Sequence, residues 1–425
     1  MEVRHGRGAA KKPRSVRPSL AANLNREFAA YFIARQSGLL GFTIEDVAVS
    51  WQIFQLRHNP LDLGLVGLVL FLPQLLLALP AGVLADRADR RAVIVISSLL
   101  EALGLAGFVA LVLLRVHSVA IYLGAVAFIG IAHSIGIPAL RSLLVNIVPQ
   151  EQFVRAQALT SSIGQLLTIA GPALGGALIA IGTPVAFGFA ALCCIAATVT
   201  YTFLRRHAVE YADEPVLHAA FEGVRFIFRR RVILGAISLD LFAVLFGGAV
   251  ALLPVYATQI LHVGPTGFGI LRAAPAVGAA LVAGYVARHS LGRGAGRLLL
   301  ICVAGFGAAT IVFGVSHSFV VSVVALALTG GFDMVSVVIR NALVQLRTPN
   351  EMRGRVGAVE NVFIGASNEL GAFESGGLAA LIGTQNSVVL GGVATLAVIA
   401  LWTLLFPELR EFEVLEADTP SSGQA

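Results

Sequence analysis

Long apolar segments separated by short polar or charged breaks make up most of this chain. A helix needs about 20 residues to cross a membrane, and each segment reaches or approaches that length. Strands of a membrane barrel would instead alternate apolar and polar residues with period two. The pattern therefore predicts an all-α membrane protein with twelve transmembrane helices. These are expected at Phe28–Leu56, Asp62–Ala85, Ala92–Leu114, Ser118–Leu140, Val154–Ile181, Pro184–Leu204, Val232–Ile260, Thr266–Ala287, Leu298–Val315, Phe319–Ile339, Val356–Ile382 and Ser387–Phe406.

The composition excludes most soluble classes of protein. Of the 425 residues, 57% are hydrophobic and 13% are charged, and the mean hydropathy is +0.85. A soluble domain has about 25% charged residues. The three cysteines lie inside apolar segments, and no C-x-x-C pair, P-loop, H-E-x-x-H or G-x-S-x-G motif occurs. We therefore expect a protein that is not an enzyme and that carries neither a cofactor nor a bound metal.

The basic residues predict the orientation in the membrane. If the N-terminus lies inside, 26 of the 30 Lys and Arg residues, Arg340 among them, fall in the inner loops and tails, and only Arg57 and Arg115 fall in outer loops. Positive charge collects on the cytoplasmic side of membrane proteins. Both termini are thus expected in the cytoplasm, with 1–27 as a basic tail and 407–425 as a second tail. The Ala, Arg and Val content suggests a bacterial inner membrane, and the basic residues in loops argue against nucleic-acid binding.

The two halves of the chain resemble each other in sequence. Ile163-Gly164, Gly175-Gly176 and Ile181-Gly182-Thr183 recur 201 positions later as Ile364-Gly365, Gly376-Gly377 and Ile382-Gly383-Thr384. Six predicted spans separate the partners, so the repeats run in the same direction, as in transporters built from two parallel halves. We expect six-helix bundles at 28–204 and 232–406, joined by a linker at 205–231.

Apolar residues recur at helical spacing inside the linker, at Leu217, Phe221, Val224 and Phe228. This spacing predicts an amphipathic helix. Such a helix lies along the inner membrane surface or is a solvated connector between the bundles. The sequence leaves both possibilities open.

Two motifs carry a family resemblance. The run Gly82-Val83-Leu84-Ala85-Asp86-Arg87-Ala88-Asp89-Arg90-Arg91 resembles the signature loop of the major facilitator superfamily, with Asp89 in place of the usual glycine. The run Gly171-Pro172-Ala173-Leu174-Gly175-Gly176 resembles the core of that superfamily's antiporter motif. The resemblance covers essentially the whole chain and implies the major facilitator fold, with two pseudo-symmetric six-helix bundles, a cavity lined mainly by spans one, four, seven and ten, and alternating access.

A third stretch narrows the resemblance to one branch. Residues 363–376 in span eleven, which include Asn368-Glu369 and Glu374-Ser375-Gly376, look like the branch that contains enterobactin-exporter-like and macrolide-efflux-like proteins. The signature loop implies a cytoplasmic gate that latches the halves together. Its expected members are Gly82, Asp86, Arg87 and Arg90 on one half and Arg353 and Arg355 on the other.

Ionisable side chains within the spans are the candidate site residues, because charge at membrane depth is costly and usually functional. Glu101, Arg35 and Arg272 also lie within spans, and Glu101 is expected to have a packing role. Glu374 is expected to be a structural acid between two helices. Asp240 and Asp333 could instead belong to a gate between the halves. The candidates for proton coupling or for the substrate cavity are Asp46, Glu45, Asp240, Asp333, Glu369 and His133.

Asp46 is the first candidate for proton coupling. Arg35 lies on the same helical face but about 16 Å away along the axis, so the two do not pair. Glu45 points about 100° away from Asp46. A carboxyl group buried in the membrane can bind and release a proton near neutral pH, which would let one site exchange substrate for a proton.

The leading hypothesis is a monomeric secondary transporter that exports amphiphilic small organic molecules, drug-like or siderophore-like, by proton antiport. A flippase for lipids or lysophospholipids would also suit the apolar spans. An uptake carrier for a small nutrient would need a denser set of polar residues in spans one, four, seven and ten. A membrane-embedded sensor or scaffold would need an accessory domain that the sequence lacks.

Overall fold

The computed structural model describes residues 26–205, 216–289 and 294–412, and these ranges contain helices but no strands. The expected N-terminal tail up to residue 25 and the C-terminal tail beyond residue 412 lie outside the described residues. In the first half the long helices are α1 (Arg26–Arg57), α2 (Pro60–Arg87), α3 (Arg90–Leu113), α4 (Val119–Ile147), α5 (Gln150–Ile181) and α6 (Thr183–Tyr201).

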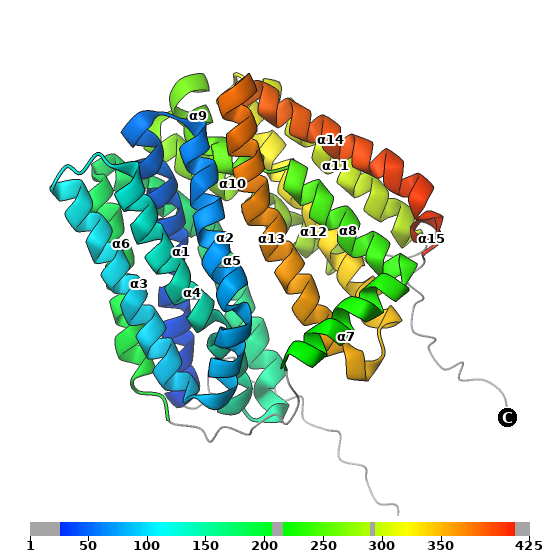
Figure 1. The fold of residues 1–425 in the computed structure, drawn as a ribbon, viewed down its shortest axis with the longest axis horizontal. Coiled ribbons are helices and arrows are strands. Elements are labelled where there is room, and N and C mark those ends of the chain that lie inside the picture. Colours follow the sequence, from blue (N-terminus) through cyan, green and yellow to red (C-terminus); the bar gives the residue numbers. More distant parts are fainter. Residues whose placement is uncertain (1–25, 206–215, 290–293, 413–425) are drawn as a thin grey trace, which may run out of the picture.

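The second half repeats this plan after the linker helix α7 (Val216–Arg229). Its long helices and shorter turns are α8 (Arg231–Phe246), η1 (Ala249–Leu252), α9 (Leu253–Val255), η2 (Tyr256–Ile260), α10 (Gly264–Val286), α11 (Ala295–Val315), α12 (Phe319–Arg347), α13 (Asn350–Ile382), α14 (Thr384–Leu405) and the short α15 (Pro407–Arg410). Figure 1 shows the two groups of helices side by side.

The prediction of an all-α membrane protein with twelve spans is confirmed. Ten segments are long and apolar enough to cross a membrane, counting residues 231–260 as one segment. The other two long helices, α1 and α13, have 32 and 33 residues and carry several of the charged side chains singled out in the sequence. Their charged side chains lower their mean hydropathy, but each helix is long enough to cross a membrane.

The segment predicted as one helix over Val232–Ile260 is broken in the structure. The helix α8 ends at Phe246, and a 3-10 turn, a short helix and a π-helical turn follow. Gly247 and Gly248 stand at the break and Pro254 follows; glycine weakens a helix and proline lacks the N–H that a helix needs. A Cβ atom on Gly248 would lie 2.7 Å from the carbonyl oxygen of Gly371. The break therefore lets the chain pass close to α13.

Equivalent helix boundaries in the two halves reflect the sequence repeat. The helices α5 and α13 both begin directly after a proline, Pro149 and Pro349. Both end at a glycine, Gly182 and Gly383, and Gly383 has a φ of +88°, in the left-handed region that favours glycine. The same local signals thus set the length of the same helix in each half.

The most extensive contacts between the halves join α2 with α13 and α5 with α10. A Cβ atom on Gly376 would lie 2.7 Å from Cα of Gly64, and one on Gly269 would lie 2.5 Å from the carbonyl oxygen of Pro172. Glycine lets the backbones approach this closely. These contacts lie where α2 and α10 begin, which is the end of the molecule away from α7 (Figure 1).

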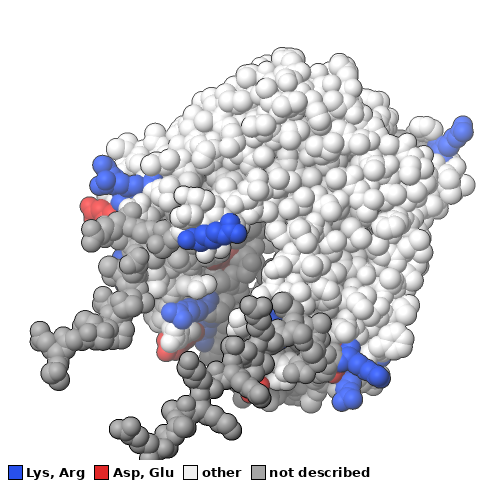
Figure 2. All heavy atoms as spheres, turned by 180° about the vertical axis from the view of Figure 1, so that it is seen from behind, with Lys and Arg blue, Asp and Glu red and all other residues white. Residues whose placement is uncertain are grey.

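The opposite end, which we call the α7 end, is more open. The ribbons of α2 and α13 diverge towards it (Figure 1), and the surface is hollowed between the halves there (Figure 2). At Gly82 in α2 and Gly284 in α10, a Cβ atom would meet nothing within 4 Å. The halves therefore touch at one end and separate towards the other.

The predicted helix in the linker is present as α7, and it packs on α13. Its contact face includes Gly223 and Ile227, and a Cβ atom on Gly223 would lie 2.8 Å from the carbonyl oxygen of Arg355. Phe221 and Phe228, from the predicted apolar face, are 70% and 61% exposed. The helix thus packs on α13 through Gly223 and Ile227 and leaves the two phenylalanines at the surface, so its place on the membrane stays a prediction.

We expect the glycine contact between α5 and α10 to be sensitive to any added side chain. In Gly269→Val the new side chain meets the α5 backbone, so the melting temperature in detergent should fall by several degrees, since overpacking costs about 1–3 kcal/mol. Gly284→Val on the same helix is the matched control, because its Cβ position is open. Equal melting temperatures for the two variants would contradict this interface.

Candidate transport site

A cavity of about 80 Å³ lies among helices of both halves. It is lined by polar and ionisable side chains from α1, α2, α4 and α13 together with apolar ones. The lining residues are Phe42, Glu45, Asp46, Val49, Ser50, Val66, Leu70, Gln74, Val126, Ile129, His133 and Glu369. Four of the six predicted coupling candidates, Asp46, Glu45, His133 and Glu369, thus share one cavity. A pocket for a drug-sized ligand has about 300–1,000 Å³, so this one suits water and small ions in the conformation seen here.

An ion pair across the cavity joins the two halves. Asp46 in α1 accepts from Arg272 in α10, with Nη2 at 2.6 Å and Nε at 2.9 Å from the same oxygen, Oδ2. The side chains are 26% and 32% exposed, for Arg272 and Asp46 respectively, so the pair remains open to water and to solutes in the cavity. The sequence places both residues within spans, but their separation of 226 positions hides the pairing. Arg35, in contrast, donates to Tyr31 of its own helix.

A second group of ionisable side chains lies on the first half's side of the cavity. His133 Nε2 in α4 is 3.3 Å from Glu101 Oε1 in α3, and Glu45 approaches both from α1. One ligand atom from each of the three residues lies within 4.8 Å of those of the other two. Glu101, which was expected to have a packing role, therefore belongs with the candidates, and its signal in the sequence was its charge at membrane depth.

Glu369 and Glu374 point in different directions, because five residues along a helix turn a side chain by about 140°. Glu369 lines the cavity, and Glu374 is not among its lining residues. Glu374 accepts a hydrogen bond from the hydroxyl of its neighbour Ser375, at 3.2 Å. Its role as a structural acid stays a prediction.

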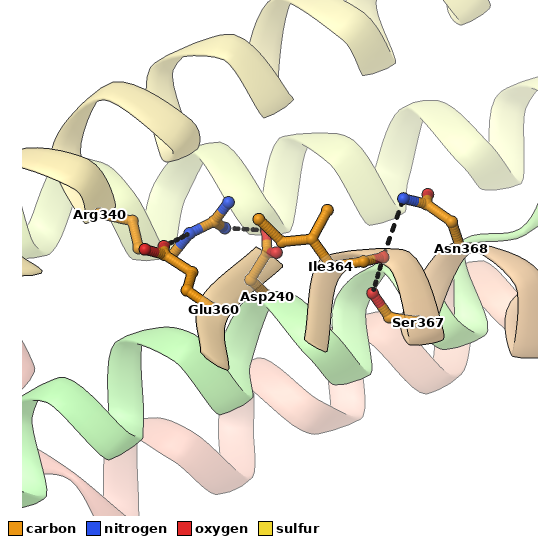
Figure 3. A network of polar contacts seen from close by, with 6 residues as sticks. All are labelled: Asp240, Arg340, Glu360, Ile364, Ser367 and Asn368. Atoms are coloured by element: carbon orange, nitrogen blue, oxygen red, sulfur yellow. Dashed lines mark hydrogen bonds and ion pairs between the residues drawn. The ribbon is translucent and has the colours of Figure 1, made fainter. Parts of the chain in front are cut away.

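The remaining two candidates, Asp240 and Asp333, lie elsewhere, in the second half. Arg340 in α12 forms ion pairs with Asp240 in α8 and with Glu360 in α13, the latter at 3.3 Å (Figure 3). Asp240 and Asp333 both line a separate cavity of about 10 Å³. The sequence counted Arg340 as a loop residue, which is wrong: it is only 3% exposed within α12. Asp240 thus pairs inside its own half, and Glu360 was missed.

Two polar residues of the family-like stretch in α13 turn back on their own helix (Figure 3). Ser367 Oγ and Asn368 Nδ2 both donate to the carbonyl oxygen of Ile364, at 2.9 and 3.0 Å. These bonds satisfy the two side chains locally. They leave Glu369, the next residue, as the group that this stretch presents to the central cavity.

The predicted gate loop is only partly described. The side chains of Asp86 and Arg87 lie outside the described residues, so the latch stays a prediction. Arg355 forms an ion pair with Glu222 of α7. Arg353 donates through Nε to two backbone carbonyl oxygens, of Gln345 at 3.2 Å and Thr348 at 3.3 Å.

The remaining residues of the predicted gate, and those of the antiporter-like motif, are described by their places on the helices. Gly82 faces open space, and Arg90 is the first residue of α3. In the motif, a Cβ atom on Gly171 would overlap the hydroxyl of Thr43 in α1, and Gly175 also faces α1. Gly176 and Pro172 face Gly269 of α10. The small residues thus let α5 pack tightly on both of the helices that carry the Asp46–Arg272 pair.

Comparison with known proteins gives the chain whole-length relatives. Residues 18–423 match the protein family described as transmembrane secretion effector. The enterobactin exporter EntS of Citrobacter koseri is 29% identical over 396 residues, which cover 91% of this chain and 93% of that protein. The enterobactin exporter EntS of Escherichia coli O6:K15:H31 is 28% identical over 407 residues, covering 93% and 95%.

Solved structures share the fold at low sequence identity. A point mutant of the nucleoside transporter NupG has a TM-score of 0.73 at 11% identity, covering 90% of this chain and all of that one. A bacterial homologue of the lysosomal transporter Spinster, inward-facing and occupied, has a TM-score of 0.72 at 14% identity, covering 90% and 97%. A bacterial homologue of the iron transporter ferroportin, inward-facing, has a TM-score of 0.69 at 16% identity, covering 92% and 100%. The likeness establishes a shared architecture.

We expect Arg340 to be a main determinant of stability. In Arg340→Gln the carboxylates of Asp240 and Glu360 stay buried without their cation, which costs about 3–5 kcal/mol in comparable pairs. The melting temperature in detergent should fall well below that of Arg353→Gln, a control that removes an exposed arginine. Adding Asp240→Asn and Glu360→Gln to Arg340→Gln should recover part of the loss. A single variant as stable as the control would contradict the role of the network.

Proposed function

The chain belongs to the transmembrane secretion effector family of the major facilitator superfamily, and we propose that it exports amphiphilic small organic molecules across a bacterial inner membrane. Siderophore-like molecules are the first substrate class, because the enterobactin exporters match more than nine-tenths of the chain. Drug-like molecules are the second. The superfamily consists of transporters, and most of the described residues lie in the helices of the two halves.

The α7 end is the cytoplasmic end in this proposal. The basic residues of the loops support this, because most of them lie at the ends of α2, α4, α6, α10 and α12 that share this side. The halves touch at the opposite end, so with this orientation the arrangement would correspond to a state open towards the cytoplasm. Alternating access would then require the glycine contacts at the far end to separate and the α7 end to close.

The ion pair between Asp46 and Arg272 is the observation that carries the proposed mechanism. It joins α1 of one half to α10 of the other beside the cavity, and water reaches it. A proton bound to Asp46 removes the negative charge that holds Arg272. Protonation therefore changes how firmly the halves are held together, which is the coupling that an antiporter needs.

Proton and substrate would compete for the same cavity. The cavity wall carries three carboxyl groups, those of Asp46, Glu369 and Glu45, and Arg272 pairs with the first of them. A substrate with hydroxyl or amine donors would bind these carboxylates in their ionised form. Protons from the outside would neutralise them and favour substrate release there. The cavity must widen for a drug-sized substrate, so binding would accompany movement of the lining helices.

Transport in inside-out vesicles tests the proposal. Under an imposed pH gradient, a lipophilic cationic dye and a catecholate siderophore should accumulate, and a protonophore should abolish the accumulation. Asp46→Asn should reduce the initial rate at least tenfold, because it removes the titratable group. Glu374→Gln, an acid outside the cavity, is the control and should keep the wild-type rate. Equal rates for Asp46→Asn and wild type would exclude Asp46 as the coupling group.

The two alternative functions give different results in the same vesicles. A lipid flippase would move a labelled lysophospholipid between leaflets without taking up either soluble probe. An uptake carrier would accumulate its substrate in right-side-out vesicles instead.

Binding without a gradient should depend on pH in a defined direction. If protons and substrate compete, the dye should bind more tightly as the pH rises, because the carboxylates lose their protons. In Asp46→Asn with Glu369→Gln this dependence should flatten, and dye fluorescence in detergent would measure it. Tighter binding at low pH in the wild type would point to proton and substrate moving together, and would overturn antiport.

A further inference from the structure

We propose that Glu45, Glu101 and His133 form a binding site for one divalent transition-metal ion in the first half of the chain. The three residues come from α1, α3 and α4, so folding alone brings them together. The sequence carries no metal motif, and nothing in the similarity to exporters requires such a site. The inference goes beyond the proposed export function and stands on separate observations.

The spacing of the three side chains suits a metal ion. Zinc binds histidine nitrogen and carboxylate oxygen at about 2.0–2.2 Å, which places two ligands of a tetrahedral site about 3.3 Å apart. His133 Nε2 and Glu101 Oε1 are already 3.3 Å apart. A ligand atom of Glu45 lies within 4.8 Å of both neighbours. Rotation of the carboxylate side chains could close that difference without a backbone shift.

Two of the ligand atoms lack the partners that buried polar atoms normally have. Glu45 is 5% exposed, and its Oε2 has no hydrogen-bond partner among the described residues. His133 Nε2 is also buried, and its contact with Glu101 is close but not aligned as a hydrogen bond. An unsatisfied buried polar atom costs about 1–3 kcal/mol. A cation at the centre of the three groups would bind both atoms.

The surrounding charges leave the group in need of positive charge. Arg272 of the second half is held by Asp46. Glu369 faces the same cavity from α13 and adds another carboxylate. Among the described residues, Glu101 is in ion-pair contact with the imidazole of His133. Two carboxylates with a neutral imidazole would be balanced by one divalent ion.

The chemistry of the ligands favours a first-row transition metal over other cations. Imidazole binds zinc, iron, copper and nickel, whereas magnesium and calcium prefer oxygen ligands alone. An organic ammonium ion would gain nothing from an imidazole nitrogen. Glu45 and His133 line the central cavity, which gives an ion a path to the site and leaves a fourth position open towards the cavity. The Phe42 ring packs edge-on against the imidazole, with the ring centroids 5.3 Å apart.

Metal binding to the full-length protein tests this site without measuring transport. Purified wild-type protein in detergent, treated with a chelator and titrated with Zn²⁺ by calorimetry, should bind one equivalent per chain. Co²⁺ should add the visible absorption bands of a site with mixed nitrogen and oxygen ligands. His133→Gln and Glu101→Gln should each weaken Zn²⁺ binding at least tenfold and remove these bands. Glu374→Gln, the control acid outside the group, should match the wild type.

The outcomes separate the metal site from simple proton binding. If Glu101→Gln fails to fold, judged by gel filtration, Glu45→Gln replaces it in the same titration. The proposal is overturned if the wild type binds no stoichiometric Zn²⁺, or if His133→Gln binds it as tightly as the wild type. Should these variants alter only the pH dependence of dye uptake, the three groups hold protons rather than a metal. If the wild-type protein binds Zn²⁺ but transports neither probe, the proposed export function is contradicted and this site remains.

Discussion

Charged side chains inside an apolar helical bundle need partners, and this constraint organises the interior of the molecule. Arg340 is buried with two carboxylates in the second half, and its neutralisation is a condition for α8, α12 and α13 to pack as they do. The pair between Asp46 and Arg272 meets the same need across the boundary between the halves, but in contact with water. A buried network favours one arrangement, whereas a hydrated pair can be broken and remade, so only the second suits a moving part.

The contacts that hold the halves together differ in how readily they exchange. At the end away from α7, glycine backbones such as those of Gly64 and Gly376 approach closely, and apolar side chains such as Trp51 and Phe268 stack across the boundary. These contacts depend on shape and on apolar packing. Next to the cavity the contact is ionic. In the transport cycle proposed above, a rocking motion of the two halves would separate the shape-based contact and break or remake the ion pair.

The halves share their architecture but not their chemistry. The starts and ends of α5 and α13 are set by the same proline and glycine signals in both halves. The ionisable groups, in contrast, differ: the first half brings Glu45, Glu101 and His133 together, and the second half surrounds Arg340 with acids. Helix length and packing require only apolar character and small residues at certain positions, so the remaining positions are free to carry different functions in each half.

The membrane fold, the number of spans and the repeat follow from the sequence alone, because long apolar segments and recurring glycine motifs are local signals. The sequence also singled out Asp46 and Glu369 as isolated charges within spans, and both line the central cavity. It also predicted the helix in the linker, which is present as α7. The partners of these charged side chains depend on how the helices pack. Asp46 and Arg272 are 226 residues apart, and Glu101 meets Glu45 and His133 only when three helices pack. Arg340 was assigned to a loop because the sequence near a helix end does not show whether a charged side chain faces water or the bundle interior. In the structure it is buried. Which faces of neighbouring helices meet depends on packing between distant segments, and no local pattern records it.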